Sequence, residues 1–187
     1  MSEAVFDPSA ESLVLPVGEG MTLERLLAVD QASVAEFLVN EWDGFSQFAP
    51  AEAGESERDG ETKAELACRI VFPGNPEDFN LAIKQERRLI GLLFLDQTNI
   101  AGLREIGYVL GKDYRKQGRA TRAVGAAIKF AFTGTDAVSL SARTLKDNVA
   151  SQRVLLKNGF QAGYTGGKII YFGLSKQRYL DQAADAA

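Results

Sequence analysis

The segment from Ile106 to Phe132 constrains the fold of this chain more than any other stretch of its sequence. It begins in an apolar run rich in β-branched and aromatic residues, which predicts a strand over Leu103–Leu110. A short basic turn follows, and apolar residues then recur at the spacing of one helix face. The segment therefore predicts a strand, a turn that contains a glycine, and a long helix.

The turn between this strand and this helix has the properties of an anion-binding site. The first N–H groups of a helix have no partner within the helix, and the positive end of the helix dipole lies there. Phosphate groups commonly bind at such a point. Gly118 lets a ligand approach the backbone closely, and Arg115, Lys116 and Arg119 add positive charge. The spacing matches neither a P-loop nor a dinucleotide-binding fingerprint, so the residues alone predict a phosphate-binding turn.

Two motifs in this half of the chain resemble a known family. Arg115-x-x-Gly118-x-Ala120 resembles the acyl-CoA pyrophosphate loop of the GNAT N-acetyltransferases. The segment from Asn148 to Phe160 is similar to the N-x-x-S-x-R-V-L-x-K-x-G-F segment of the ribosomal-protein N-acetyltransferase branch, the RimJ/RimL-like proteins. The two motifs stand in the order and spacing of that family. The resemblance is clear from Leu103 to Phe172 and weaker before it.

The resemblance implies a site for acetyl-CoA as cosubstrate, with no metal. In the family, the backbone N–H groups of the loop hold the pyrophosphate, and the preceding strand splays from the next one and pairs with the pantetheine arm. The side-chain amide of Asn148 would reach the pantetheine or cysteamine end, a role compatible with capping the helix that it begins. The residues implied to bind the cofactor are Tyr108, Val109, Leu110, Arg115, Gln117, Gly118, Arg119, Ala120, Thr121 and Asn148.

The resemblance also implies two catalytic residues. Many GNAT enzymes protonate the departing thiolate with a tyrosine at the position of Leu155, which a leucine cannot do. The RimJ/RimL-like branch carries a serine instead, here Ser151, on the same helix face as Asn148. Glu105 matches the glutamate that several GNAT enzymes use as base. A purely structural role stays open for each residue. Ser151 could be a helix hydroxyl bonded to its own backbone, and Glu105 could be a solvated carboxylate at the edge of a strand. Arg122 stands where the branch commonly has a glutamate, so a contact made by that glutamate is not expected here.

Composition excludes several other chemistries. The chain of 187 residues has no histidine and one cysteine, so triads built on histidine and an internal disulfide are excluded. Its formal net charge of −4 argues against non-specific nucleic-acid binding. No apolar run reaches the length that spans a membrane, and the N-terminus lacks a basic and apolar signal region. A cytoplasmic setting is therefore expected.

The pattern predicts a flexible tail over residues 1–11, and the resemblance implies a single GNAT domain over 12–187. The expected class is α/β, with a mixed, mostly antiparallel sheet of six to seven strands and helices on both faces. Met21–Val29 fits strand or helix by its pattern, and the resemblance favours a strand. The further predicted strands are Phe79–Lys84, Arg88–Leu95, Leu103–Leu110, Ala137–Ala142, Phe160–Tyr164 and Lys168–Leu174. Helices are predicted from Asp30 to Asn40, Glu61 to Phe72, through the segment after Gly118, from Asn148 to Asn158, and from Ser175 onward.

The function implied is transfer of an acetyl group from acetyl-CoA to a primary amine, on a peptide N-terminus or a small molecule, by direct transfer in a ternary complex. A GNAT-fold module that binds acyl-CoA without turnover is the alternative, and an unrelated α/β protein with another phosphate ligand is a further one. Trp42, Phe45 and Phe48 either line the acceptor pocket or pack the first helices onto the sheet. Homodimers are common in this fold, although no interface is visible in the sequence.

Overall fold

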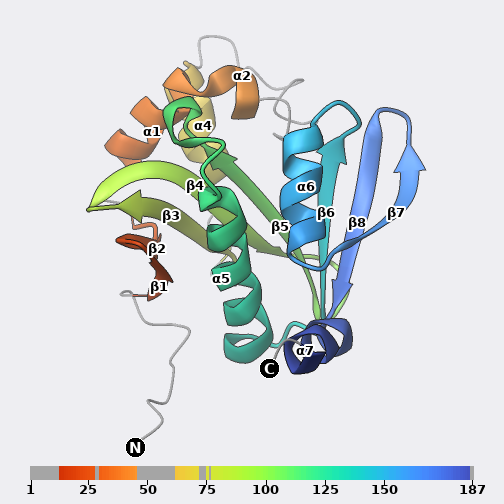
Figure 1. Ribbon diagram of the computed structural model, residues 1–187. Helices are drawn as coiled ribbons and strands as arrows, with labels where there is room; N and C mark the ends of the chain where they lie inside the picture. Colours follow the sequence, from red (N-terminus) through yellow and green to blue (C-terminus); the bar gives the residue numbers. More distant parts are fainter. Residues whose placement is uncertain (1–12, 28–29, 46–61, 72–74, 76, 186–187) are drawn as a thin grey trace, which may run out of the picture.

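The computed structural model describes residues 13–27, 30–45, 62–71, 75 and 77–185 (Figure 1). The predicted tail over residues 1–11 lies outside them. The strands are β1 (Val14–Gly18), β2 (Met21–Arg25), β3 (Phe79–Gln85), β4 (Arg88–Gln97), β5 (Leu103–Leu110), β6 (Ser139–Leu145), β7 (Gln161–Gly166) and β8 (Ile169–Ser175). The helices are α1 (Gln31–Asn40), α2 (Trp42–Phe45), α4 (Lys63–Val71), the short 3₁₀ helix η2 (Lys112–Tyr114), α5 (Arg119–Gly134), α6 (Val149–Lys157) and α7 (Lys176–Asp185).

The described strands form one sheet of eight, in the order β1-β2-β3-β4-β5-β6-β8-β7. Neighbouring strands are antiparallel except β5 and β6, which are parallel. The predicted class is confirmed, but the sheet has one strand more than the six to seven expected. The additional strand is β1, which turns back through Gly18, Glu19 and Gly20, all with positive φ, to pair with β2.

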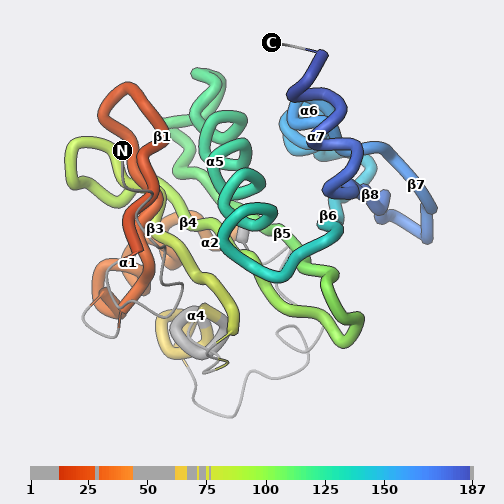
Figure 2. Tube along the Cα trace, turned by 90° about the horizontal axis from the view of Figure 1, so that it is seen from below, coloured from red at the N-terminus to blue at the C-terminus, as the bar shows by residue number. Residues whose placement is uncertain are grey.

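Helices cover both faces of the sheet, as predicted. In the end-on view, α5, α6 and α7 lie on one side and α1, α2 and α4 on the other (Figure 2). Successive side chains of a strand point to opposite faces, so β4 buries Leu93 against the α5 side and Leu92 against the α1 side. The helix face predicted in α5 is the buried one, since Val124, Ala127 and Ile128 are almost fully inaccessible to solvent.

Local chemistry fixes where most elements begin and end. Thr62 and Glu65 form a reciprocal capping box at the start of α4, with the Thr62 N–H 2.8 Å from the Glu65 carboxylate. Asn148 begins α6 and Gly159, at φ +86°, ends it. The predicted span of β6 is wrong by a few residues. Ala137 still belongs to the turn after α5, where its N–H bonds the Thr135 hydroxyl. At its other end β6 runs on to Leu145, because backbone pairing with β8 does not require apolar side chains.

Candidate active site

β5 and β6 part from one another inside the sheet. They pair only from Leu103–Ser139 to Glu105–Ser141, and beyond that point β5 is bonded to β4 alone and β6 to β8 alone. We call the stretch where 106–110 and 142–145 face each other without pairing the β5–β6 split; the two strands diverge in Figure 1. Because each strand has lost a partner on this side, backbone N–H and C=O groups face the split. The separation expected along Tyr108, Val109 and Leu110 is therefore present.

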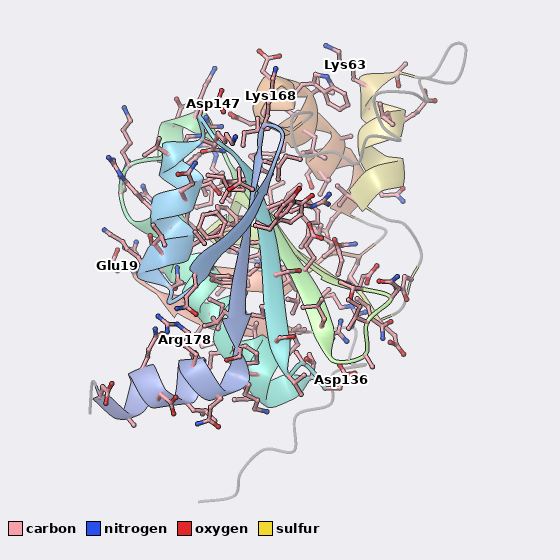
Figure 3. All side chains as sticks on the ribbon, turned by 90° about the vertical axis from the view of Figure 1, so that its right-hand side faces the viewer. Glu19, Lys63, Asp136, Asp147, Lys168 and Arg178 are labelled. Carbon is pink, nitrogen blue, oxygen red and sulfur yellow. The ribbon has the colours of Figure 1, made fainter. Side chains whose placement is uncertain are left out.

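Two helices begin at the open end of the split. The chain leaves β5 through η2 and enters α5, and it leaves β6 through a tight turn and enters α6. Asp147 and Lys168 lie at one end of the sheet, and Asp136 and Arg178 at the other (Figure 3). The Lys146 N–H donates to the Lys168 carbonyl over 2.8 Å, so the β7–β8 turn borders the start of α6. The positive ends of two helix dipoles thus face one region.

The loop into α5 has the backbone that the sequence predicts for an anion site. Lys116 and Gly118 both have positive φ, at 64° and 72°. Gly118 is the N-cap residue of α5 and provides no capping side chain, and the first helical hydrogen bond runs from the Arg122 N–H to its carbonyl. The N–H groups of Arg119, Ala120 and Thr121 precede that bond, so they are available to a ligand. A Cβ at Gly118 would lie 3.3 Å from Arg122 Nη1.

The arginines of the loop are held in place rather than extended into solvent. Arg115 donates through Nε to the Leu110 carbonyl at 2.8 Å and through Nη2 to Glu41 at 2.7 Å. The other oxygen of that carboxylate accepts the Lys112 N–H at 3.0 Å, which ties the end of α1 to the loop. Arg119 bonds Gln85 and Gln117, with its guanidinium 5.7 Å from the centre of the Tyr114 ring. These contacts fix the loop's positive charge beside α5.

Arg122, the residue that replaces the family's usual glutamate, bonds away from the split. Its Nη2 forms an ion pair of 2.7 Å with Glu19 in the β1–β2 turn. Its Nη1 lies 3.4 Å from the Gln117 carbonyl, and its buried Nε has no hydrogen-bond partner in the described part of the chain. Arg122 therefore joins the start of α5 to the edge of the sheet.

The start of α6 brings three of the predicted residues together. Asn148 Oδ1 accepts the Ser151 N–H at 3.0 Å, so the capping role is real and the amide NH₂ of Asn148 remains as a donor. The Ser151 hydroxyl lies 2.8 Å from the hydroxyl of Tyr108, which also donates to the Ser151 carbonyl over 3.2 Å. Burial raises the pKa of Tyr108 to about 12, although the bond to Ser151 acts in the opposite direction. Leu155 is fully buried in the core, which agrees with its exclusion as an acid.

Glu105 lies at the closed end of the split and is paired. Its Oε1 accepts the Arg143 Nε–H at 2.6 Å, with the Glu105 side chain 31% exposed. The register places Asp96 of β4 directly opposite Glu105. Burial raises the pKa of Asp96 to about 7, and the carboxylates of Asp78 and Glu105 act in the same direction. Glu105 is therefore a partly exposed, ion-paired carboxylate beside Asp96, and its two readings, as a base and as a solvated strand-edge carboxylate, both stay open.

Asp96 is the residue that sequence reasoning missed. It follows an almost continuous apolar run, Leu89–Leu95, and is the last residue but one of β4, the strand that precedes β5. An acid at that position in a hairpin can be matched to its cross-strand partner once the turn is located. The pairing of the β4–β5 hairpin therefore could have identified Asp96 as a neighbour of Glu105, whereas the family resemblance implies a role for Glu105 alone.

Glu105 and Ser151 approach the split from opposite faces of the sheet. Tyr108, which holds Ser151, packs with the cluster on the α5 side, whereas Val109 belongs to the cluster on the α1 side. Glu105 precedes Val109 by four residues and so points to the α1 side. A molecule lying in the split can therefore meet a carboxylate from one face and a hydroxyl from the other.

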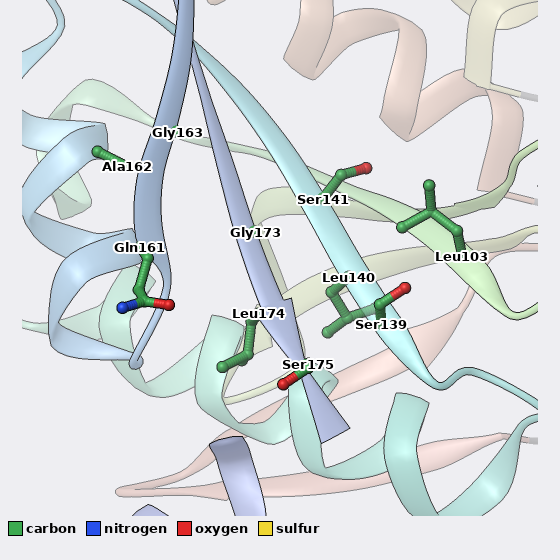
Figure 4. Close-up of a pocket in the computed structure, with 10 residues that line it drawn as sticks. All are labelled: Leu103, Ser139, Leu140, Ser141, Gln161, Ala162, Gly163, Gly173, Leu174 and Ser175. Carbon is green, nitrogen blue, oxygen red and sulfur yellow. The ribbon is translucent and has the colours of Figure 1, made fainter. Parts of the chain in front are cut away.

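A separate hollow of about 500 Å³ lies over β6, β8 and β7 (Figure 4). Serine, glycine and alanine residues make up much of its wall, together with Leu103, Leu140, Gln161 and Leu174. None of the predicted site residues lines it, although Ser141, the register partner of Glu105, and Leu103 of β5 do. The predicted site is thus the split and not this hollow.

Of the three aromatic residues near the first helices, only Trp42 has a described side chain. It packs against the core cluster on the α1 side, which supports the packing role for this residue. The side chain of Phe45 and the whole of Phe48 lie outside the described residues, as do the acidic residues Glu52, Glu55, Glu57 and Asp59. In the described part of the chain, no group of three or more metal-binding side chains is present, and no helix is long and apolar enough to cross a membrane.

The fold and the site together define an α/β protein with an uncapped helix N-terminus beside a parted pair of parallel strands. Residues 21–161 match the acetyltransferase (GNAT) domain. The chain belongs to this family, and the prediction of the family is confirmed.

Individual relatives agree with this assignment. An uncharacterized N-acetyltransferase, p20 of Bacillus licheniformis, is 31% identical over 95 residues, which are 49% of this chain and 52% of that protein. The chain thus spans about half the length of the curated relative it matches.

Two solved structures show the same fold. RimL, a ribosomal L7/L12 alpha-N-protein acetyltransferase, in complex with coenzyme A, aligns with a TM-score of 0.67 at 14% identity, over 87% of this chain and 98% of that one. Spermidine N-acetyltransferase from Vibrio cholerae, in complex with CoA and spermine, aligns with a TM-score of 0.65 at 15% identity, over 87% and 99%. At these identities the likeness concerns the fold.

Proposed function

We propose that this protein is an N-acetyltransferase that moves an acetyl group from acetyl-CoA to a primary amine by direct transfer. The observation that carries the proposal is the β5–β6 split, with an uncapped helix N-terminus at its open end and a carboxylate and a hydroxyl on its two faces. Acetyl-CoA supplies an acyl thioester when it is bound. The remaining chemistry is binding, orientation and proton transfer, which the residues of this chain can provide.

The residues of the loop fit a pyrophosphate. The N–H groups from Gln117 to Thr121 surround a helix start that has no side-chain cap, and Arg115 and Arg119 place positive charge beside it. From Tyr108 to Leu110, β5 has no partner strand on the side of the split, so its backbone there can bond the amide groups of a pantetheine arm as a neighbouring strand would. The Leu110 carbonyl is already occupied, since it accepts from Arg115 Nε. The NH₂ group of Asn148 is a further donor at the same end.

Proton transfer is assigned to the two faces of the split. The attacking amine must lose a proton, and the departing sulfur must gain one. Glu105 accepts the amine proton, directly or through water, and Arg143 orients its carboxylate. Ser151 donates to the sulfur from the other face, where Asn148 fixes the first turn of its helix. The amine, as a cation before it is deprotonated, is favoured by the carboxylate of Glu105.

The acceptor is a primary amine on a peptide N-terminus or on a small molecule. The printed names of the two solved relatives cover both classes, an alpha-N-protein acetyltransferase and a spermidine N-acetyltransferase. The RimJ/RimL-like segment Asn148–Phe160 favours the peptide N-terminus. The cytoplasmic setting and a homodimer remain predictions.

The test is a turnover assay with acetyl-CoA, in which thiol release is followed with a panel of peptides, polyamines and aminoglycosides. The proposal expects release above the background hydrolysis for at least one amine, and acetylated product by mass spectrometry. Ser151→Ala should lower the rate and keep CoA affinity. Binding of CoA with no turnover on any amine would favour the alternative of a module that holds acyl-CoA without catalysis.

A further inference from the structure

The hydroxyl of Tyr108 is bonded to Ser151 alone among the described residues. It lies 2.8 Å from Ser151 Oγ and 3.2 Å from the Ser151 carbonyl oxygen. Tyr108 is on β5, at the split, and Ser151 is in the first turn of α6, so the contact joins the two walls of the site across 43 positions of sequence. The backbone role implied for Tyr108 does not use this hydroxyl.

The contact controls where the proton of Ser151 points. Between two hydroxyls either atom can be the donor. When Tyr108 donates to Ser151 Oγ, the proton of Ser151 is free to point into the split. When Tyr108 donates to the Ser151 carbonyl, the Ser151 proton bonds back to the phenol oxygen. A phenol that stays protonated can provide both arrangements, whereas a phenylalanine can provide neither.

No other part of the described site can take over this task. Leu155, at the position where the family's usual tyrosine stands, is buried in the core and has no polar atom. Asn148 uses its carbonyl oxygen on the Ser151 N–H and so holds the backbone of the first turn, not the hydroxyl. The orientation of Ser151 Oγ therefore depends on Tyr108.

We propose that Tyr108 is a positioning residue that holds the Ser151 hydroxyl for donation to the departing sulfur. The proposal rests on the proposed function. In the step, the amine nitrogen forms its bond to the acetyl carbon as the carbon–sulfur bond breaks, and Glu105 takes the amine proton. Ser151 gives its proton to the sulfur and is reprotonated from solvent, and Tyr108 keeps its own proton throughout. With Tyr108 on β5 in this role, a tyrosine at the position of Leu155 on α6 is not needed.

The experiment is a double-mutant cycle on the full chain, with kcat, the KM for acetyl-CoA, CoA affinity and Tm measured for each variant. The variants are Tyr108→Phe, Ser151→Ala and the pair of them together. The matched control is Tyr179→Phe, because the Tyr179 ring packs at a tilt against Phe132 near the end of α5 and is remote from the split. Ser151→Thr is added, alone and combined with Tyr108→Phe, because it keeps a hydroxyl on the same carbon.

The proposal expects Tyr108→Phe to lower kcat about tenfold or more, as for loss of one hydrogen bond in the transition state. KM for acetyl-CoA and CoA affinity should stay within about twofold, since the backbone of β5 is unchanged. In the Ser151→Ala background the same change should have no further effect, because the two residues act as a unit. Ser151→Thr should keep most of its activity only while Tyr108 is present.

Three outcomes would overturn the proposal when the wild type is active. If Tyr108→Phe has the kcat of the wild type, the hydroxyl has no role in turnover. If the two single effects multiply in the double variant, Tyr108 does not act through Ser151. If Tyr108→Phe lowers Tm and CoA affinity together with kcat and Ser151→Thr is equally impaired with Tyr108 present, the contact only supports the fold. Absence of turnover by the wild type on any amine would overturn the proposed function and this inference together.

Discussion

Glu105 and Ser141 form the last register pair between β5 and β6, and the two strands separate immediately after it. The position of this pair determines the geometry of the whole site. It places Glu105 at the closed end of the split, and it leaves the rest of β5 without a partner on that side. The chain then turns into α5 and α6, whose first turns lie at the open end.

Gly118→Ala tests the donor loop. Gly118 has φ +72°, and its Cβ would lie 3.3 Å from Arg122 Nη1. An alanine there costs about 1–2 kcal/mol in a left-handed conformation and places a methyl group at the N–H groups of α5. We expect CoA affinity to fall about tenfold or more, measured by calorimetry.

Gly18→Ala is the matched control for that variant. Gly18 also has positive φ, at 94°, but a Cβ there would meet no heavy atom within 4 Å. Gly18→Ala should lower Tm as Gly118→Ala does, and it should leave CoA affinity unchanged. Equal CoA affinities for the two variants would remove the α5 loop from the binding site.

Glu105→Gln tests the assignment of the base. The substitution keeps the size of the side chain and removes its capacity to accept a proton at the amine. We expect kcat to fall by about 10²-fold or more, with CoA affinity retained. The control is Glu24→Gln, which breaks the other strand-to-strand carboxylate pair, a bond of 2.7 Å to Lys84 that lowers the pKa of Glu24, away from the split. A Glu105→Gln enzyme as fast as Glu24→Gln would show that the proton leaves the amine by another route.

Two substitutions at Asn148 separate its capping role from its proposed contact with the donor. Asn148→Asp keeps the oxygen that accepts the Ser151 N–H and loses the NH₂ group, so stability should be retained and CoA affinity should fall. Asn148→Ala loses both and should in addition destabilise the protein by about 1 kcal/mol. Thermal unfolding and CoA titration measure the two effects. An Asn148→Asp variant with full CoA affinity would reduce Asn148 to a helix cap.

Asp96→Asn tests the half-buried acid opposite Glu105. Its pKa is raised from 3.8 to about 7, so between these pH values the folded state keeps a proton that the unfolded state has lost. The free energy of unfolding therefore decreases as the pH rises through this window. The asparagine variant lacks this decrease, and its stability relative to the wild type should grow from pH 4 to pH 8 by up to about 4 kcal/mol.

Denaturant titrations across that pH range check the prediction, with Asp185→Asn as the control because Asp185 is exposed at the end of α7. A constant difference between Asp96→Asn and the wild type at all pH values would show that Asp96 is ionised in the folded protein at the same pH as in the unfolded one.

The sequence predicts the positions of the elements that have local signals, such as a cap residue or a charged turn. The local pattern locates β5 to the residue, because its apolar run ends at a charged turn, and Asn148 and Gly159 locate α6. The pattern does not assign β1, because a strand of five residues with alternating exposure gives little periodicity by itself. It becomes a strand through its pairing with β2.

The predicted site residues lie around the split, but their partners cannot be read from the sequence. The bond from Tyr108 to Ser151 and the ion pair from Glu105 to Arg143 join distant segments, and they depend on where β5 and β6 part. The same holds for Glu41, whose carboxylate secures the α5 loop from the end of α1. Periodicity gives the face of a strand, and it does not give the side chain that another element will bring to that face.

Calorimetric titration of the protein with acetyl-CoA is the most direct test of the central claim, that the β5–β6 split and the α5 loop form the donor site. Free CoA and ATP serve as comparison ligands. The account predicts one binding site for acetyl-CoA and CoA, weakened by Gly118→Ala, and no comparable binding of ATP. Absence of CoA binding, or ATP binding as tightly as CoA, would contradict the assignment of the loop and with it the roles of Glu105 and Ser151.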